Sequence, residues 1–258
     1  MPDIEYAVDE HVATITLNRP HRKNAFTTAM VDAWADALIT ASGDDLVRAV
    51  VVTGAGGAFC SGVDLEEFKG ATRAPADQKR FLTDHVHRVA RAVEALDKPL
   101  VAAVDGAAVG AGMDMALMCD YRVGSRTARL AEAYIRIGLV PGDGGCWLLP
   151  RIVGRSRALR MLWTGEFVDA QEALALGILD ELADDCLARA HQFAAQVAAQ
   201  PPVAVQMIKR AVRQGAQQDL LSALDLVSSH FGILSATADS AEAYNAFVEH
   251  RTPKFTGR

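Results

Sequence analysis

The feature that most constrains this chain is a pair of short, unbroken apolar and β-branched runs, Ala49–Thr53 and Leu100–Val104. A run without polar alternation is typical of a strand that is buried on both faces, as in parallel sheets covered by helices. Apolar residues at helical spacing predict a helix over Gln78–Leu96 between the two runs, and Tyr121–Val123 predicts a further strand. Strands joined by helices form right-handed crossovers, so the sequence predicts an α/β fold.

The ends of the chain differ from this middle part. Near the N-terminus, Val8–Leu17 alternates apolar and polar residues and predicts one half-buried strand. After about Pro150 the strand signals fade, and Asp169 with Glu172 predicts a capping box at the start of a helix. Alanine-rich segments then predict helices over 185–199, 202–214, 220–231 and 240–250. Pro201-Pro202 is the clearest boundary, which divides the chain into a core domain (1–200) and a C-terminal helical region (201–258).

Composition excludes several classes of protein. The chain has 258 residues with 26 basic and 32 acidic side chains, and its net charge of −6 argues against binding to nucleic acid or an anionic membrane. Its cysteines lie far apart, without a C-x-x-C pair, so neither a disulfide scaffold nor a zinc site is expected. The acidic N-terminus does not resemble a secretory signal, and the apolar stretch 100–118 is interrupted by Asp105 and Asp114. We therefore expect a cytoplasmic protein without a membrane span.

Several familiar motifs are incomplete. The Gly54-x-Gly56 and Gly110-x-Gly112 pairs lack the third glycine of a dinucleotide-binding loop, and no P-loop lysine follows them. His85 and His87 are two positions apart on a predicted helix, which indicates a solvated face rather than metal ligands. Cys60, Cys119, Cys146, Trp147 and Trp163 are expected to pack in the core.

Two loop-to-helix junctions, 54–65 and 105–114, each follow a predicted buried strand. Small residues at such a corner allow a ligand to approach the backbone, where N–H groups at a helix start have no helical partner. Two corners that face each other could form an oxyanion hole from main-chain donors. Each glycine cluster taken singly is more typical of a tight turn, and the pairing of the two after successive buried strands is the more informative feature.

Asp114 is the one charged residue in the apolar segment 109–119. A buried carboxylate is costly unless it is partnered or neutral, and burial raises its pKa toward the range that suits proton transfer near neutral pH. The alternative is a structural carboxylate that accepts hydrogen bonds from a nearby loop. The residues alone leave both interpretations open.

The chain resembles the enoyl-CoA hydratase/isomerase (crotonase) superfamily from end to end. The resemblance is carried by six ordered segments: VATITLNRPHRKNAF, AVVVTGAGGAFCSGVDLEEF, KPLVAAVDGAAVGAGMDMALMCDYRVGS, AEAYIRIGLVPGDGG, LLPRIVGRSRAL and AFVEHRTPKFTGR. It implies a crotonase-like spiral of βαβ units and a C-terminal helical region that assembles homotrimers, or dimers of trimers. It also implies a coenzyme A thioester as substrate, with no permanently bound cofactor and no metal.

The resemblance further implies the roles of individual residues. The Ser61 and Ala111 amides would hold the thioester oxygen, and the polar segment 66–84 would form a pocket wall. Phe231 and Phe247 match aromatic residues that line the coenzyme or acyl pocket, in some relatives across the subunit boundary. His250 stands where hydratases carry a phosphate-binding lysine. The coenzyme pocket maps to Arg22, Lys23, Ala25, Ala58, Ser61, Val63, Asp64, Leu65 and Gly110.

The sequence departs from the hydratase pattern at the two carboxylates that position water. Asp114 stands at the first position, where a glutamate is usual, and Tyr134 stands at the second. Glu132 or Asp143 could supply the missing acid. We expect an enzyme that hydrates a 2-enoyl-CoA, or catalyses the reverse elimination, with Asp114 as general acid/base and Tyr134 as an orienting group. The alternatives are an enoyl-CoA double-bond isomerase and a weakly catalytic acyl-CoA-binding protein.

Overall fold

The computed structural model describes residues 2–68 and 74–258, so part of the expected pocket wall, residues 69–73, lies outside the described residues. A six-stranded sheet forms the centre of the fold, and its strands are parallel except for the first pair. In spatial order the strands are β1 (Ile4–Asp9), β2 (Val12–Leu17), β3 (Ala49–Gly54), β5 (Leu100–Val104), β7 (Tyr121–Ser125) and β10 (Glu181–Ala183). The predicted α/β class is confirmed.

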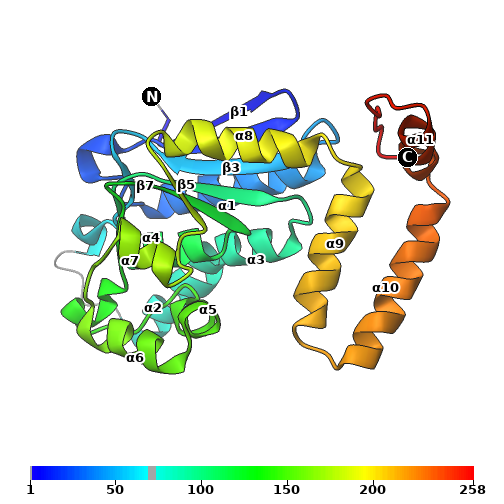
Figure 1. The fold of residues 1–258 in the computed structure, drawn as a ribbon. Helices are drawn as coiled ribbons and strands as arrows, with labels where there is room; N and C mark the ends of the chain where they lie inside the picture. Colours follow the sequence, from blue (N-terminus) through cyan, green and yellow to red (C-terminus); the bar gives the residue numbers. More distant parts are fainter. Residues whose placement is uncertain (1, 69–73) are drawn as a thin grey trace.

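Helices cover both faces of this sheet, which explains the apolar runs. The side chains of Val50 and Val52 on β3 belong to the core under α1 (Thr28–Gly43) and α3 (His87–Ala95). Their neighbours Ala49 and Val51 belong to a second core under α8. Figure 1 shows α8 (Cys186–Ala198) on one side of the sheet and α1 and α3 on the other. Each strand residue is therefore buried, whichever face its side chain takes.

The prediction of one strand over Val8–Leu17 was wrong in its extent. The chain forms a hairpin in which β1 pairs antiparallel with β2, and Asp9 lies opposite Val12. Glu10 and His11 form the turn with φ angles of 41° and 72°. A type I′ hairpin turn requires positive φ at both of its central positions and usually carries Asn or Gly there. Glu and His give no such signal, so the turn was not recognised.

A smaller sheet of four strands lies at the carboxyl ends of the main strands, in the order β4 (Ala58–Cys60), β6 (Ala107–Val109), β8 (Arg129–Ala131) and β9 (Val168–Asp169). β4 follows β3 along the chain, β6 follows β5 and β8 follows β7, so the same corner is made three times. Gly106 shows how tight the corner is. Its φ is 57°, and a Cβ there would lie 2.1 Å from the Gly57 carbonyl oxygen. The repeated corners bring the chain's glycine-rich loops side by side.

The remaining helices complete the body and form a C-terminal arm. Gln78–Leu96, predicted as one helix, is divided by a π turn at Leu82–Val86. The other helices are α2 (Pro75–Phe81), α4 (Ala111–Leu117), α5 (Gly145–Val153), α6 (Arg155–Thr164), α7 (Ala170–Ala175), α9 (Pro202–Gly215), α10 (Leu220–Ser235) and α11 (Ala238–Val248), with 3-10 turns at Pro20–Arg22, Leu65–Phe68 and Ala133–Ile137. The predicted cap is confirmed, since the Asp169 side chain accepts from the Glu172 amide.

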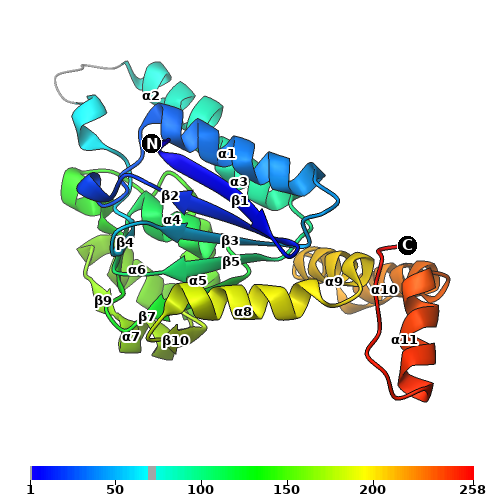
Figure 2. The same ribbon diagram turned by 90° about the horizontal axis from the view of Figure 1, so that it is seen from above.

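The C-terminal arm begins at Pro202, where the sequence predicted a boundary. Figure 2 shows α10 and α11 projecting from the body beside α9. The Lys209 ammonium on α9 contacts the Asp120 carboxylate at 2.6 Å, and Arg210 pairs with Asp97, so α9 is tied to the body. Within the described residues no single helix is long and apolar enough to cross a membrane. The bent pair α10 and α11, which meet at 72°, passes that test only when the two are taken together.

Candidate active site

The buried acid Asp114 lies on α4, whose position is fixed by close packing against the small sheet. The helix follows Gly110, which has a φ of 54° and closes the turn from β6. A Cβ on Gly112 would lie 2.0 Å from the Cys60 carbonyl oxygen, so α4 rests directly on the β4 backbone. Every residue of α4 is buried, and Asp114 has no exposed surface. The unusual acid is therefore inside the protein, as its sequence context predicted.

The Tyr134 hydroxyl lies between two carboxyl groups. It is 2.7 Å from Asp114 Oδ2 and 2.7 Å from Asp143 Oδ2, both within the usual range for O–H···O hydrogen bonds. A phenol has a single proton and can donate to only one of them. The other contact is a hydrogen bond only if that carboxyl carries a proton and donates it to the phenol oxygen. Asp114, Tyr134 and Asp143 therefore form one chain of shared protons.

This arrangement bears on which residue accompanies Asp114, a question that the sequence left open among Tyr134, Glu132 and Asp143. Asp143 lies in the loop before α5, and only 4% of its surface is exposed. Its carboxyl group is connected to Asp114 through the Tyr134 hydroxyl, and its backbone N–H also favours the charged form of Asp114. The position of Asp143 is held in part by His87 on α3, whose Nε2 lies 2.7 Å from the neighbouring Gly142 carbonyl oxygen. His85 and His87 were predicted to lie on a solvated face. The His85 side chain is 38% exposed, with Nδ1 2.8 Å from Asp32 Oδ2, and His87 is half-buried.

Glu132 is a second fully buried acid, with no exposed surface. It follows β8 directly, and Gly110 N–H donates to the Ala131 carbonyl at 2.7 Å, which places Glu132 beside the start of α4. The absence of a side chain at Gly145 leaves room for both acids. A Cβ there would lie 2.3 Å from Asp114 Oδ1 and 2.9 Å from Glu132 Oε1. Three carboxyl groups, those of Asp114, Glu132 and Asp143, are thus gathered around one small volume.

Burial shifts these groups toward their neutral forms. Burial and the charge of Asp143 raise the pKa of Asp114 to about 7, although the hydrogen bond from Tyr134 opposes the shift. Burial and the charge of Asp114 raise the pKa of Glu132 to about 10. Burial also raises the pKa of Asp143, and burial together with both aspartates holds the pKa of Tyr134 well above its usual range. At neutral pH the phenol and Glu132 are protonated, and Asp114 is poised to gain or lose a proton.

The backbone donors differ from the prediction at one position. Ser61 N–H donates to the Lys23 carbonyl at 3.0 Å, so this amide is already used within the fold, and its assignment to the thioester oxygen was wrong. The amide two residues on, Val63, has no hydrogen-bond acceptor among residues 2–68 and 74–258. Phe26 bonds to the Gly62 carbonyl and the Asp64 amide on either side of Val63, which directs Val63 N–H to the opposite side of the strand.

Ala111 provides the second free amide at the start of α4, where helical N–H groups have no partner within the helix. A Cβ on Gly62 would lie 3.6 Å from Ala111 N and 2.9 Å from the Val109 carbonyl oxygen, so the Val63 and Ala111 peptides are neighbours. The two predicted glycine-rich corners do face each other. The candidate donors are therefore the amides of Val63 and Ala111. The sequence resemblance placed Val63 only in the coenzyme pocket.

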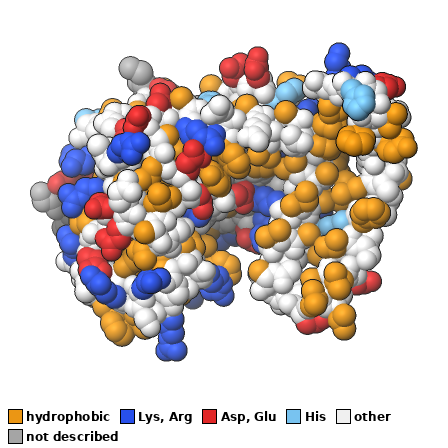
Figure 3. All heavy atoms as spheres, viewed as in Figure 1, with side chains coloured by type: hydrophobic (Ala, Val, Ile, Leu, Met, Phe, Trp, Pro, Cys, Tyr) orange, Lys and Arg blue, Asp and Glu red, His pale blue; other side chains and the backbone are white. Residues whose placement is uncertain are grey.

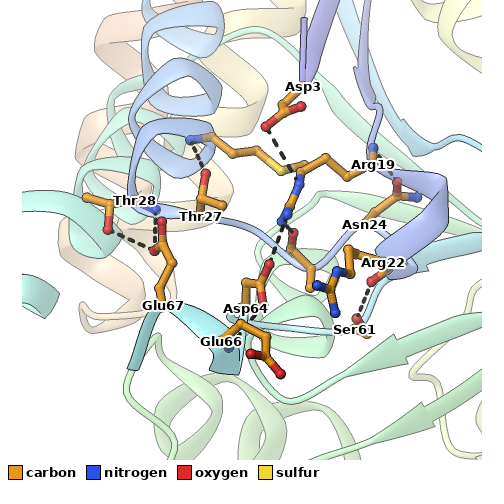
Figure 4. Close-up of polar contacts among 12 residues, drawn as sticks. Asp3, Arg19, Arg22, Asn24, Thr27, Thr28, Ser61, Asp64, Glu66 and Glu67 are labelled. Atoms are coloured by element: carbon orange, nitrogen blue, oxygen red, sulfur yellow. Dashed lines mark hydrogen bonds and ion pairs between the residues drawn. The ribbon is translucent and has the colours of Figure 1, made fainter. Parts of the chain in front are cut away.

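The predicted coenzyme-binding loop is held by an ion pair and an amide side chain. Figure 4 shows the Arg19 guanidinium between Asp3 and Asp64, with Nη2 2.9 Å from Asp64 Oδ2. The buried Asn24 donates from Nδ2 to the Ala55 and Ala58 carbonyls, which fixes the loop against the first corner. Sequence reasoning missed Arg19 and Asn24, although both lie in a segment that carried the resemblance.

The outcome for the predicted coenzyme-pocket residues is mixed. Arg22 and Lys23 are exposed beside the first corner, and Ser61 Oγ donates to the Arg22 carbonyl at 3.2 Å, whereas Ala25 and Ala58 are buried. The Asp64 carboxylate is taken up by Arg19, and its backbone N–H donates to the Phe26 carbonyl, so Asp64 holds the loop in shape. Phe231 and Phe247 are 73% and 80% exposed, and Figure 1 shows their helices α10 and α11 far from α4. Within one copy of the chain these two aromatic residues do not line the site.

Asp64→Asn is expected to destabilise the fold. Burial opposes ionisation of Asp64, but hydrogen bonds from Arg19 and the Glu66 amide outweigh it and lower the pKa of Asp64. Breaking a buried pair costs about 3–5 kcal/mol. Because the folded-state pKa is depressed, the stabilisation is present above about pH 4, the unfolded value, and is lost as the pH falls below it. Urea unfolding at pH 7 and pH 3 measures both effects: the variant should be less stable at pH 7 and less sensitive to acid. Equal stability of the two proteins at pH 7 would contradict this role.

The described residues contain no cluster of histidine, cysteine and acidic side chains suited to a metal ion. The four cysteines are free thiols, and Cys146 is exposed rather than packed as predicted.

The chain as a whole is similar to a well-defined set of proteins. Residues 7–258 match the family model described as Enoyl-CoA hydratase/isomerase. The 1,2-epoxyphenylacetyl-CoA isomerase of Escherichia coli is 36% identical over 97% of this chain and 97% of that protein. The 2,3-dehydroadipyl-CoA hydratase of the same species is 35% identical, with 100% of each chain covered. The solved structure of an enoyl-CoA hydratase from Bacillus anthracis has a TM-score of 0.93 at 30% identity and covers 100% of both chains.

These similarities extend over the body and the C-terminal arm alike, and they confirm the crotonase-like fold that the sequence resemblance implied. Proteins of this family act on coenzyme A thioesters. The chain belongs to the enoyl-CoA hydratase/isomerase family.

Proposed function

We propose that this protein adds water across the double bond of a 2-enoyl-CoA, or catalyses the reverse elimination, through a thioester enolate. The observation that carries the proposal is the position of Asp143, which is linked to Asp114 through Tyr134. Hydration needs one group to take a proton from water and one to deliver a proton to carbon. Asp114 and Asp143 supply two such groups despite the phenol at the second carboxylate position. Relatives named as enoyl-CoA hydratases support this class of reaction.

The free amides of Val63 and Ala111 would hold the thioester oxygen. That oxygen gains negative charge as water attacks the β-carbon, and fixed N–H dipoles stabilise the charge where it develops. Asp114 in its ionised form would accept a proton from the attacking water. Tyr134, whose raised pKa keeps it protonated, would orient Asp114 and connect it to Asp143. Asp143 in its protonated form would deliver its proton to the α-carbon of the enolate. Tyr134 would then pass its own proton to Asp143 while it receives the proton that Asp114 took from water, which returns all three groups to their starting state.

Double-bond isomerisation is the second candidate, favoured by the same shared-proton chain. An isomerase removes a proton from one carbon and returns it to another, which a single connected group of acids can do without holding a water. The two candidates predict products that differ in mass relative to their substrates.

Mass spectrometry of thioester products separates the two. With 2-enoyl-CoA substrates, hydration increases the product mass by one water, whereas isomerisation of a 3-enoyl-CoA changes its retention time without changing its mass. We expect the mass gain. A panel that gave only isomers would favour the second candidate, and tight coenzyme A binding without turnover would identify a binding protein instead.

We propose further that Arg22 and Lys23 bind coenzyme phosphates, with Ala25, Ala58, Leu65 and Gly110 around the rest of the ligand and no permanently bound cofactor. Both basic side chains are exposed beside the first corner and carry no carboxylate partner among the described residues. Arginine and lysine at such a position suit phosphate groups. Free thiols at all four cysteines support a reducing compartment, and we propose the cytoplasm.

We propose that residues 201–258 form a helical unit, distinct from the 1–200 domain, that assembles a homotrimer or a dimer of trimers. Figure 3 shows apolar side chains gathered over the C-terminal arm. Exposed large apolar residues there include Ile208, Val212, Leu221, Phe231 and Phe247. Contiguous apolar surface of this kind indicates an interface between subunits. Light scattering measures the mass directly: a trimer or hexamer is expected, and a monomer at micromolar concentration would contradict it.

A further inference from the structure

The fully buried Glu132 has no assigned part in the proposed reaction, and its surroundings are unusual. Both of its carboxyl oxygens are buried without a hydrogen-bond partner among the described residues, and so is Asp114 Oδ1. A buried carboxylate with no partner costs several kcal/mol, and proteins avoid it by pairing or neutralising the group. Three such oxygens in one place therefore require an explanation.

The geometry around Gly145 provides one. The position that a Cβ of Gly145 would take is 2.3 Å from Asp114 Oδ1 and 2.9 Å from Glu132 Oε1, so these two unpartnered oxygens border the same small space. If each group were ionised, two negative charges would meet in a dry interior. A single proton shared by the two carboxyl groups removes one of the charges and forms a hydrogen bond between the two oxygens.

We propose that Glu132 is a positioning residue which carries a proton at neutral pH and donates it to Asp114 Oδ1, so that Asp114 is held as the ionised base between two donors. Tyr134 occupies the other oxygen of Asp114 at 2.7 Å. A carboxylate with one donor on each oxygen has a fixed orientation, and donation to the charged form favours ionisation. The hydrogen bond from Glu132 thereby offsets part of the energetic penalty that burial places on the charged form of Asp114.

The neighbouring charges support this assignment of the proton. The titratable groups that face Glu132 are Asp114 on α4, Asp143 before α5 and Cys146 on α5, with Tyr134 close by on its own segment. Burial and the charge of Asp114 raise the pKa of Glu132 to about 10, whereas that of Asp114 rises only to about 7. Asp114 already accepts a hydrogen bond from Tyr134, which favours its charged form, whereas neither oxygen of Glu132 has a donor among the described residues. The proton therefore resides on Glu132 when the pair shares one. This inference rests on the proposed function only in treating Asp114 as the proton-transfer group.

The pH profile of Glu132→Gln tests the assignment, since glutamine keeps a neutral donor of nearly the same shape. We expect Glu132→Gln to retain kcat/KM within about threefold at pH 7, since the donor to Asp114 remains. In the unaltered protein, kcat/KM should fall at alkaline pH as Glu132 loses its proton, and this limb should be absent in Glu132→Gln. Glu132→Leu removes the donor, and we expect kcat to fall about tenfold or more with KM little changed.

Infrared spectroscopy provides a readout that needs no substrate. With isotope-labelled glutamate, the ligand-free protein at pH 7 should show the carbonyl band of a protonated glutamic acid, and this band should be missing in Glu132→Gln. Absence of the band in the unaltered protein would overturn the proposal. So would a loss of activity of about a hundredfold in Glu132→Gln, which would make Glu132 an ionised base. If the band is present but no enoyl-CoA is turned over, the proposed function fails while the protonation of Glu132 stands.

Discussion

Asp114→Asn is expected to lower turnover of a 2-enoyl-CoA by about 10²–10⁴-fold, the usual contribution of a positioned acid or base. The amide cannot accept a proton from water near neutral pH, although it has nearly the shape of the carboxylate. Because α4 is fixed by packing of Gly112 on β4 rather than by the Asp114 charge, the fold should persist. Burial raises the pKa of Asp114 and so disfavours its charged form in the folded protein. Replacing it with a neutral amide should therefore leave stability equal or higher.

Steady-state kinetics, coenzyme A binding and thermal unfolding of Asp114→Asn measure these effects together. Asp9→Asn, on the exposed edge of β1, is the matched control, since it makes the same chemical change away from the site. The control should be indistinguishable from the unaltered protein. Turnover by Asp114→Asn within a few-fold of the control would remove Asp114 from the reaction.

Ala111→Pro should have the next largest effect, because it deletes one N–H of the proposed oxyanion hole. Ala111 is the first residue of α4, a position where proline is tolerated because no helical hydrogen bond is lost. Loss of a single such donor lowers kcat by about 10²–10³-fold. The loss should appear in kcat far more than in coenzyme A binding, since the amide acts on the charge of the transition state.

Ala111→Gly is the control for this experiment, because it changes the same residue and keeps the N–H group. It should retain turnover close to that of the unaltered protein. Circular dichroism establishes whether Ala111→Pro still folds. A folded Ala111→Pro with turnover equal to that of Ala111→Gly would exclude the amide from the mechanism.

Much of the fold could be predicted from local pattern, because the pattern has a direct physical cause. Ala49–Thr53 and Leu100–Val104 are apolar throughout since helices cover both faces of their strands. The Glu10-His11 turn carried no glycine or asparagine and was missed. Trp147 and Trp163 were expected in the core but are 52% and 69% exposed, since size alone does not show which side of a helix meets the body.

The site was predictable to the extent that its features are local in sequence. Asp114 stood out because its neighbours are apolar, and the two glycine-rich corners were recognised by composition. The Ser61 assignment was wrong because the partner of its amide, the Lys23 carbonyl, lies far away in sequence. The meeting of Tyr134 with Asp143, and of Glu132 with Asp114, depends on how β8 and α5 pack beside α4. Neither spacing nor composition contains that information.

The most direct test of this account is a crystal structure with a bound acyl-CoA thioester. The account predicts the thioester oxygen within about 3 Å of both Val63 N and Ala111 N. It also predicts that the α- and β-carbons lie beside the Asp114 carboxyl group. A thioester oxygen bound elsewhere, with the two amides facing solvent or separate cavities, would contradict it.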